Sequence, residues 1–155
     1  MSSEIPFTLR PATIDDFPLA ERLYLETMEP LLSHIGHWDR EEFVGRIKAL
    51  FDPAAAKIII VDGAPAGWLQ LAEADGDINI VQLHLTAETR NRGIGTALLE
   101  NVLNRARETG KTASLSSPRN NRAIELYKRL GFVVSRDDGG GIIDMIWWRD
   151  DEAGQ

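Results

Sequence analysis

The chain has 155 residues, a formal net charge of −7 and no cysteine. This length suits one domain with its own core, and 43% hydrophobic and 26% charged residues are ordinary for a globular protein. The absence of cysteine excludes disulfides, thiolate metal ligands and a thiol nucleophile. The sequence pI is about 4.9, so the chain lacks the excess of basic residues that is typical of nucleic-acid binders. An acidic surface favours the approach of cationic molecules.

The N-terminus, MSSEIPFTLR, has neither the basic start nor the apolar run of a signal peptide. No stretch approaches the 18 or more apolar residues that a membrane span needs. We therefore expect a cytoplasmic protein with no membrane partner. A single domain is predicted at 7–149, with flexible ends at 1–6 and 150–155.

The first half of the chain alternates turn residues with apolar runs. Asp62-Gly63 and Asp75-Gly76 predict two hairpin turns. Thr13, three residues before Asp16, is typical of a helix start, and Pro30 is expected to end that helix. The predicted elements are a strand at 7–10, a helix to about Met28, a helix after Asp39 to near Phe51, and strands at 57–61, 67–72 and 78–86.

The second half contains two helices and a final hairpin. The helix after Gly95 carries one apolar face and ends at Gly110. A short strand at 112–115, a helix at 121–130 and strands at 132–135 and 142–148 follow. The order β-α-α-β-β-β-α-β-α-β-β predicts an α/β fold with a mixed central sheet and about four flanking helices.

The segment Arg90-Asn91-Arg92-Gly93-Ile94-Gly95 lies between a predicted strand and a predicted helix. Glycines let the backbone approach a ligand closely, and the first amides of a helix have no partner inside it. Together with the helix dipole they form an anion site suited to a pyrophosphate. Two arginines add positive charge to this loop of an acidic protein.

Two other ligand-binding motifs fit this loop less well, and a structural role stays open. A dinucleotide fingerprint needs a third glycine where Leu98 stands, and a nucleotide-triphosphate loop needs Lys and then Ser or Thr where Thr96-Ala97 follows. A nicotinamide-binding fragment is therefore disfavoured. A purely structural turn stays open, because glycines are common at tight strand-to-helix turns.

The pattern (Gln or Arg)-x-x-Gly-x-(Gly or Ala) at this junction resembles the acetyl-CoA signature of the GCN5-related N-acetyltransferases (GNAT). Two further segments are similar to that family: Leu9-Arg10-Pro11-Ala12-Thr13 near the start, and the run from Asn120 to Phe132, with its Asn-x-x-Ala start, tyrosine and closing Gly-Phe. The resemblance spans about residues 7–148. The chain departs from it at Ala87 and Thr89, where a proline and an aromatic residue are usual, and at Asn91, where glycine is usual.

The resemblance implies direct transfer of the acetyl group from acetyl-CoA to an amine within a ternary complex. It implies that main-chain amides of the loop hold the pyrophosphate and that the pantetheine arm runs along the strand at 83–86, with an amide near Leu85 on the acetyl oxygen. The cofactor contacts that it implies are Leu83, Leu85, Thr86, Arg90, Asn91, Arg92, Gly93, Ile94, Gly95, Thr96, Asn120, Ala123 and Tyr127. Asn120 is alternatively a helix cap.

The resemblance also implies that Tyr127 donates a proton to the leaving thiolate, although a core tyrosine fits the same helix position. The base stays open. His84 titrates in the useful range, Glu73 and Asp77 are alternatives, and water can carry the proton. By counting back from the loop, Asn79 stands where some relatives carry a catalytic glutamate, and an amide cannot serve as a base.

The acceptor amine, of a small molecule, amino acid or peptide, is expected near 28–38, with Glu29, His34, Trp38 and Glu73 as contacts. Trp38 is alternatively a packing residue. His34 and His37 lack a third ligand, so no metal is expected. One of Trp147 and Trp148 should pack inward, and the other should face a neighbouring molecule or the acceptor cleft. A homodimer contact at this tryptophan is a hypothesis. The competing hypothesis is a CoA-binding sensor or partner module with little catalysis.

Overall fold

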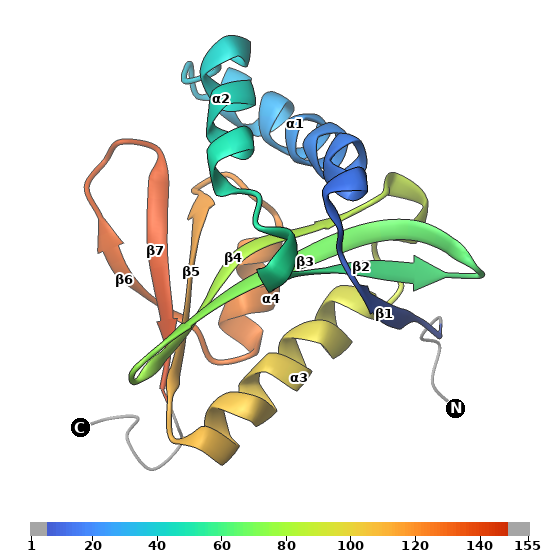
Figure 1. Cartoon of the computed structure of the whole chain (residues 1–155). Coiled ribbons are helices and arrows are strands. Elements are labelled where there is room, and N and C mark those ends of the chain that lie inside the picture. The colour runs from blue at the N-terminus through green and yellow to red at the C-terminus, as the bar shows by residue number, and fades with distance from the viewer. Residues whose placement is uncertain (1–5, 149–155) are drawn as a thin grey trace. The chain divides into compact units, whose positions relative to one another are not determined.

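A computed structural model describes residues 6–148 (Figure 1). The α-helices are α1 (Phe17–His34), α2 (Arg40–Leu50), α3 (Ile94–Thr109) and α4 (Ala123–Arg129). The strands are β1 (Thr8–Pro11), β2 (Ala56–Val61), β3 (Ala64–Ala74), β4 (Asp77–Leu85), β5 (Thr112–Pro118), β6 (Val133–Asp137) and β7 (Ile142–Trp147). This order is the predicted one. The ends predicted to be flexible lie outside the described residues, apart from Pro6.

The strands follow the order β1-β2-β3-β4-β5-β7-β6 in one seven-stranded sheet. β4 pairs with β5 in parallel, whereas β1 with β2, β2 with β3, β5 with β7 and β6 with β7 pair antiparallel. The mixed sheet with four α-helices confirms the predicted fold class. Asp62 and Gly63 both have positive φ, of 52° and 78°, as the predicted hairpin turn between β2 and β3 requires.

The chain divides into two compact units. The first comprises the described part of Met1–Leu71 with Gln82–Gly95, and the second comprises Ala72–Val81 with the described part of Thr96–Gln155. Because β3 and β4 each pass from one unit to the other, both units contain part of the sheet. The single domain predicted at 7–149 stays a prediction.

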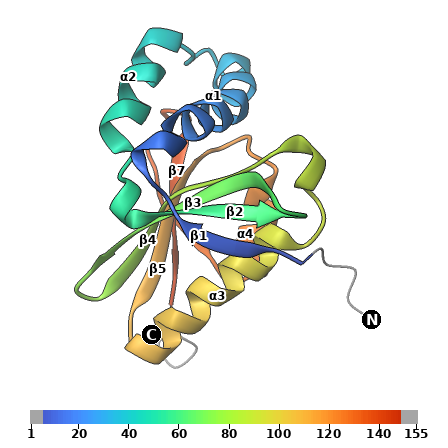
Figure 2. The same ribbon diagram turned by 45° about the vertical axis from the view of Figure 1, so that its right-hand side comes forward.

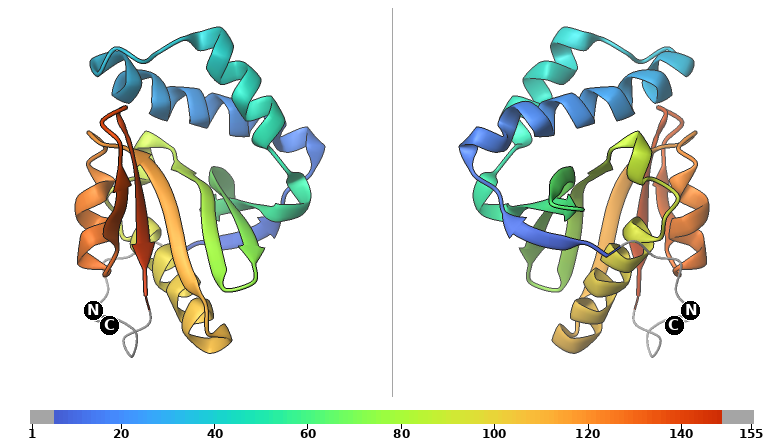
Figure 3. Two further views of the ribbon diagram at one scale, coloured as in Figure 1. Left: turned by 90° about the vertical axis from the view of Figure 1, so that its left-hand side faces the viewer. Right: turned by 90° about the vertical axis from the view of Figure 1, so that its right-hand side faces the viewer.

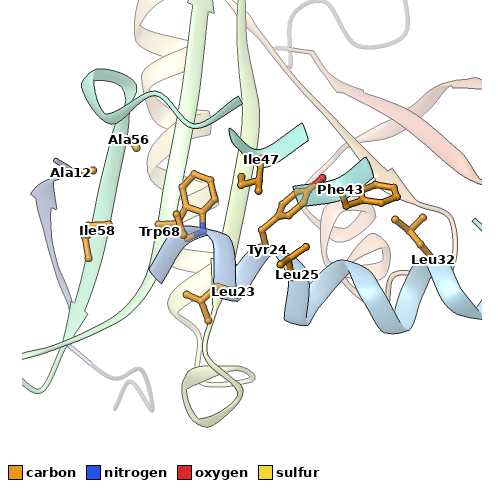
Figure 4. Packing of buried hydrophobic residues seen from close by; sticks show 11 residues of the cluster. Ala12, Leu23, Tyr24, Leu25, Leu32, Phe43, Ile47, Ala56, Ile58 and Trp68 are labelled. Carbon is orange, nitrogen blue, oxygen red and sulfur yellow. The ribbon is translucent and has the colours of Figure 1, made fainter. Parts of the chain in front are cut away.

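The core of the first unit lies between α1, α2 and strands β2 and β3. Figure 4 shows Leu23 and Tyr24 of α1, Phe43 and Ile47 of α2, and Trp68 of β3 within this cluster. All five are buried, Trp68 and Ile47 completely. In Figure 2 the strands β1, β2 and β3 lie side by side, as their pairing requires. Burial of these side chains holds β2 and β3 against the two helices.

Helix α1 runs to His34, so the predicted end near Met28 is wrong. Pro30 lies inside the helix, although a proline removes one backbone hydrogen bond there. Leu32, beyond the proline, is 2% exposed and belongs to the core of the first unit. Burying a leucine contributes roughly 1.5–3 kcal/mol, comparable to the ~3 kcal/mol cost of an interior proline. Tertiary packing therefore offsets the local break.

The core of the second unit is built on β5 and β7, which lie side by side with β6 in Figure 3. Residues alternate along β7, so that Ile143, Met145 and Trp147 are buried. The Arg107 guanidinium of α3 lies 5.0 Å from the centre of the Trp147 ring. Trp148 is 46% exposed, which confirms that one tryptophan packs inward and its neighbour outward. Contact of Trp148 with a second copy remains a prediction.

Among residues 6–148, no helix combines the length and the apolar character needed to cross a membrane.

Candidate functional site

The loop that precedes α3 has two residues with a left-handed backbone. Gly93 has a φ of +84° and Asn91 a φ of +62°. Asparagine enters this left-handed region more easily than other side chains, which explains why it can replace the glycine usual at this position. Helix α3 begins at Ile94, directly after Gly93. The loop therefore leads straight into a helix N-terminus, where amides and the helix dipole favour an anion.

The turn before this loop is a short 3₁₀ helix, Ala87–Thr89, which the sequence did not predict. The buried Thr89 hydroxyl donates to the Thr86 carbonyl at 3.0 Å and lies 2.9 Å from the Thr86 hydroxyl. The Thr89 amide donates to the same carbonyl at 3.1 Å. Thr86 and Thr89 thus close a hydrogen-bonded turn, which includes the two positions, Ala87 and Thr89, where the chain departs from the family pattern.

The peptide group that joins Leu85 to Thr86, at the end of β4, is held at both its carbonyl and its amide. Arg90 Nε donates to the Leu85 carbonyl at 3.1 Å, and the Thr86 amide donates to the Ala66 carbonyl of β3 at 2.8 Å. The first bond uses the Nε–H edge of the Arg90 guanidinium to fix the strand end. Arg90 therefore has a structural contact in addition to the charge that it brings to the loop.

A pocket of about 240 Å³ lies beside this turn in the first unit. It is lined by Val61, Asp62, Ala64, Pro65, Ala66, Thr86, Glu88, Thr89 and Arg92. Sequence reasoning missed it, because its walls come from the β2–β3 turn and from the segment after β4, which are distant in the sequence. Its lining combines both signs of charge.

His84 is buried in an aromatic environment. Its ring centre lies 5.8 Å from that of Tyr24, edge to face, and 5.6 Å from that of Trp68. Nε2 lies 2.6 Å from Gln82 Oε1, whereas Nδ1 has no hydrogen-bond partner among the described residues. Burial, helped by the positive charge of Arg90, lowers the pKa of His84 to about 3. The imidazole is therefore neutral near pH 7 and is a weak base, rather than a group that titrates in the neutral range as expected.

This environment predicts how the stability of the fold changes with acid. The pKa of histidine is near 6.5 in the unfolded chain and about 3 for His84 in the folded protein. Between these two pH values the unfolded chain therefore binds a proton at His84 that the folded protein does not. The free energy of unfolding should fall by about 1.4 kcal/mol per pH unit below pH 6.5. Urea denaturation of the wild type and of His84→Phe between pH 6.5 and 5 measures this. Equal slopes for the two proteins would contradict the burial of a neutral imidazole.

The other groups considered as bases have partners within the second unit. Glu73 accepts from Arg105 at 2.9 Å and from Lys111 at 3.3 Å, and the bond from Arg105 lowers the pKa of its carboxyl below the usual value. Asp77 accepts from the Thr112 hydroxyl at 2.8 Å and the Ser114 hydroxyl at 2.6 Å. Both carboxylates stabilise the structure around β5. These bonds also favour a structural role for Glu73 over the predicted acceptor contact.

Asn79 donates to the Ser114 hydroxyl of β5 at 3.0 Å. An amide cannot accept the proton that a carboxylate would take at this position. The chain thus has a hydrogen-bonding side chain, and no base, where some relatives carry glutamate.

Tyr127 lies on α4 in the second unit, with its ring centre 6.1 Å from that of Phe132 and the two rings inclined at 62°. Burial raises the pKa of its phenol above the usual 10. The hydroxyl therefore keeps its proton at neutral pH, which an acid must do. Packing and acid chemistry are compatible for this side chain, because the ring can pack while the hydroxyl is used.

The start of α4 is bonded by Asn121 rather than by Asn120. Asn121 Oδ1 accepts from the Ala123 amide at 2.9 Å, and its Nδ2 donates to the Ser117 hydroxyl at 3.0 Å. The capping role considered for Asn120 is thus filled by its neighbour. The cofactor contact predicted for Asn120 stays a prediction.

Three of the four residues predicted to meet the acceptor lie near the end of α1. Glu29 and His34 are exposed, whereas Trp38 is partly buried and stacks on Phe43 with ring centres 5.0 Å apart. Trp38 also packs against the core of the first unit, which supports the alternative packing role. No three acidic or histidine side chains within residues 6–148 gather in a way that could hold a metal ion.

Comparisons with known proteins give the chain its family. Residues 16–132 match the model of the Acetyltransferase (GNAT) family. Over 120 residues the chain is 32% identical to a mycothiol acetyltransferase of Acidimicrobium ferrooxidans, covering 72% of this chain and 37% of that protein. It is 28% identical over 138 residues to an uncharacterized N-acetyltransferase of Methanocaldococcus jannaschii, covering 81% of this chain and 60% of that one. The chain therefore spans less than two thirds of the length of either relative.

A solved structure shares the fold. The PaiA N-acetyltransferase of Thermoplasma acidophilum, crystallised with coenzyme A, superposes with a TM-score of 0.73 at 17% identity, over 93% of this chain and 99% of that one. The family match covers the loop, β4 and Tyr127 together. The chain belongs to the GNAT family of acetyltransferases.

Proposed function

We propose that this protein transfers the acetyl group of acetyl-CoA directly to the primary amine of a small molecule, amino acid or peptide. The observation that carries the proposal is the loop at 90–95, with positive φ at Asn91 and Gly93 and a helix start directly behind it. Such a backbone turns successive amides toward one anion. The family match over residues 16–132 adds the acyl-transfer chemistry to this binding geometry.

The residues present fit acetyl-CoA. Gly93 and Gly95 keep side chains away from the loop backbone, and a Cβ built on Gly95 would meet no atom closer than 4.0 Å, so the alanine that the family motif also allows would be accommodated. Arg90 and Arg92 bring positive charge to a diphosphate. When bound, acetyl-CoA would supply the acetyl group as a reactive thioester. Leu83, Leu85 and Thr86 would offer backbone groups along its pantetheine arm.

Two proton transfers accompany the reaction. Tyr127, with its raised pKa, would give a proton to the leaving thiolate and would be replenished from solvent. The attacking amine must first lose a proton. His84 is a weak base, and Glu73 and Asp77 are held by hydrogen bonds. We therefore assign removal of the proton from the ammonium group to water rather than to a side chain.

The weak candidate bases also favour one competing function, a CoA-binding sensor or partner module with little catalysis. Thiol release from acetyl-CoA separates the two functions. With a panel of primary amines, from monoamines and polyamines to amino acids and basic peptides, the enzyme should release CoA thiol faster than the amine-free control. Binding of CoA without amine-dependent thiol release across the panel would support the module instead.

A further inference from the structure

Gly67 of β3 occupies a position where no side chain fits. A Cβ at this residue would lie 2.3 Å from the His84 carbonyl oxygen, 2.9 Å from Leu85 Cδ2 and 3.2 Å from Ile59 Cδ1. The backbone of Gly67 is not in the left-handed region. Glycine is therefore required because a side chain would have no room, and not because of the backbone torsion angles. The nearest atom is a backbone oxygen of β4.

The pairing of β3 with β2 is irregular at the same place, because Ala66 of β3 has no partner in the register. In the pairing of β2 with β3, Ile59 is opposite Gly67 and Ile60 is opposite Pro65, so the register shifts between these two residues. Such irregularities bend a strand and redirect its side chains and peptide groups. The close approach of β3 to the His84 carbonyl thus coincides with a local bend of the sheet.

The His84 carbonyl and the Leu85 amide belong to one planar peptide group, in which C=O and N–H point in opposite directions. Whatever sets the direction of the His84 carbonyl also sets the direction of the Leu85 N–H. The following peptide is held independently, because Arg90 Nε donates to the Leu85 carbonyl and the Thr86 amide donates to the Ala66 carbonyl. The Leu85 N–H is therefore oriented from both sides.

We propose that Gly67 is a positioning residue for acyl transfer. Its missing side chain lets the His84 carbonyl lie over β3, and this aims the Leu85 N–H at the oxygen of the acetyl group. The inference rests on the proposed function, in which an amide near Leu85 polarises that oxygen. Removing a donor to a developing oxyanion slows catalysis by about 10²–10³-fold, so turning a donor aside should have a large part of that effect.

The test replaces Gly67 with alanine and reads the acetyl carbonyl directly. Isotope-edited infrared spectra of acetyl-CoA labelled with ¹³C at the carbonyl, at saturating protein, report the hydrogen bond to that oxygen. In the wild type the carbonyl band should lie below its frequency in free acetyl-CoA. In Gly67→Ala the band should return toward the free value, and kcat should fall by about 10–100-fold. The affinity for CoA should change by less than about threefold, because CoA has no acetyl group.

The matched control is Gly45→Ala in α2, where a Cβ would meet no atom within 4 Å and the φ is also outside the left-handed region. This variant should keep the wild-type band and kcat. An unshifted band in the wild type, with CoA bound, would contradict the role of Leu85 and hence of Gly67. A wild-type band in folded Gly67→Ala would overturn the inference while leaving the proposed function intact, whereas failure of the wild type to bind CoA would remove that function itself.

Arg90→Lys tests the second contact that orients Leu85, whether or not Gly67→Ala folds. Lysine keeps the positive charge of the loop but lacks the Nε donor that holds the Leu85 carbonyl at 3.1 Å. At saturating acetyl-CoA its carbonyl band should move part of the way toward the free value. A band identical to that of the wild type would show that the Arg90 contact is dispensable and would leave the orientation of the Leu85 N–H to Gly67. An unshifted carbonyl band in the wild type with CoA bound would overturn the inference even if Gly67→Ala does not fold.

Discussion

Replacing Gly93 with valine should abolish CoA binding while the chain still folds. At a φ of +84° a β-branched residue is strongly strained, and the loop would relax into another conformation. Its amides would then no longer converge on the diphosphate. Losing two hydrogen bonds to a charged group costs roughly 1.5–3 kcal/mol each, so the affinity should fall by about 100-fold or more. Calorimetric titration with CoA measures the change.

The matched control for this variant is Gly139→Val. Gly139 has a φ of +82° in the turn between β6 and β7, and a Cβ there would meet no atom within 4 Å. It therefore introduces the same side chain into the same backbone conformation outside the loop. Both variants should lose a similar part of their stability, but only Gly93→Val should lose CoA binding. Equal affinities in the two variants would contradict the role of the loop.

Tyr127→Phe should lower kcat by about 10²-fold or more and leave KM for acetyl-CoA nearly unchanged. General acids contribute typically about 10²–10⁴-fold to a rate, and removing one affects the transition state rather than ground-state binding. Burial raises the pKa of Tyr127 above its usual value. The acid form therefore persists as pH rises, and any loss of kcat due to Tyr127 should begin only above pH ~10.

The chain has one other tyrosine, Tyr24, whose pKa is also raised by burial. Tyr24→Phe removes a second buried hydroxyl without touching α4, so it separates the acid role from a general effect of losing a phenol. Steady-state kinetics of both variants from pH 6 to 11 give the comparison. A wild-type kcat in Tyr127→Phe, or an equal loss in Tyr24→Phe, would count against Tyr127 as the acid.

Sequence patterns predicted the order of the elements because the relevant signals are local. Asp62-Gly63 has the positive φ values of a hairpin turn, and Gly110 and Gly131 have positive φ directly after α3 and near the end of α4. The pattern at 90–95 likewise predicted a strand-to-helix junction, and α3 begins within it at Ile94. The end of α1 was misplaced because Leu32 packs into the core, an interaction that no local rule at Pro30 contains.

The site was only partly predictable for a related reason. The low pKa of His84 depends on Tyr24 and Trp68, which reach it from α1 and β3. The ion pairs of Glu73 with Arg105 and Lys111 and the close approach of Gly67 to β4 also join distant segments. Periodicity shows which face of a strand is buried, but it does not show which partner covers that face. Residue types near a motif therefore indicate which reactions are possible, but they do not indicate the pKa of side chains such as His84 and Glu73 in the folded protein.

The central claim is that main-chain amides at 90–96 bind the diphosphate of coenzyme A. Calorimetric and thermal-shift titrations of the purified wild type with CoA, and with pantetheine as the fragment lacking the diphosphate, test it most directly. CoA should bind one per chain, release heat and raise the melting temperature, with about 2.7 kcal/mol of added stability at 100 times its Kd. Pantetheine should bind far more weakly. Titration with CoA that gives neither heat nor a change in melting temperature, or equal affinities for the two ligands, would contradict the claim.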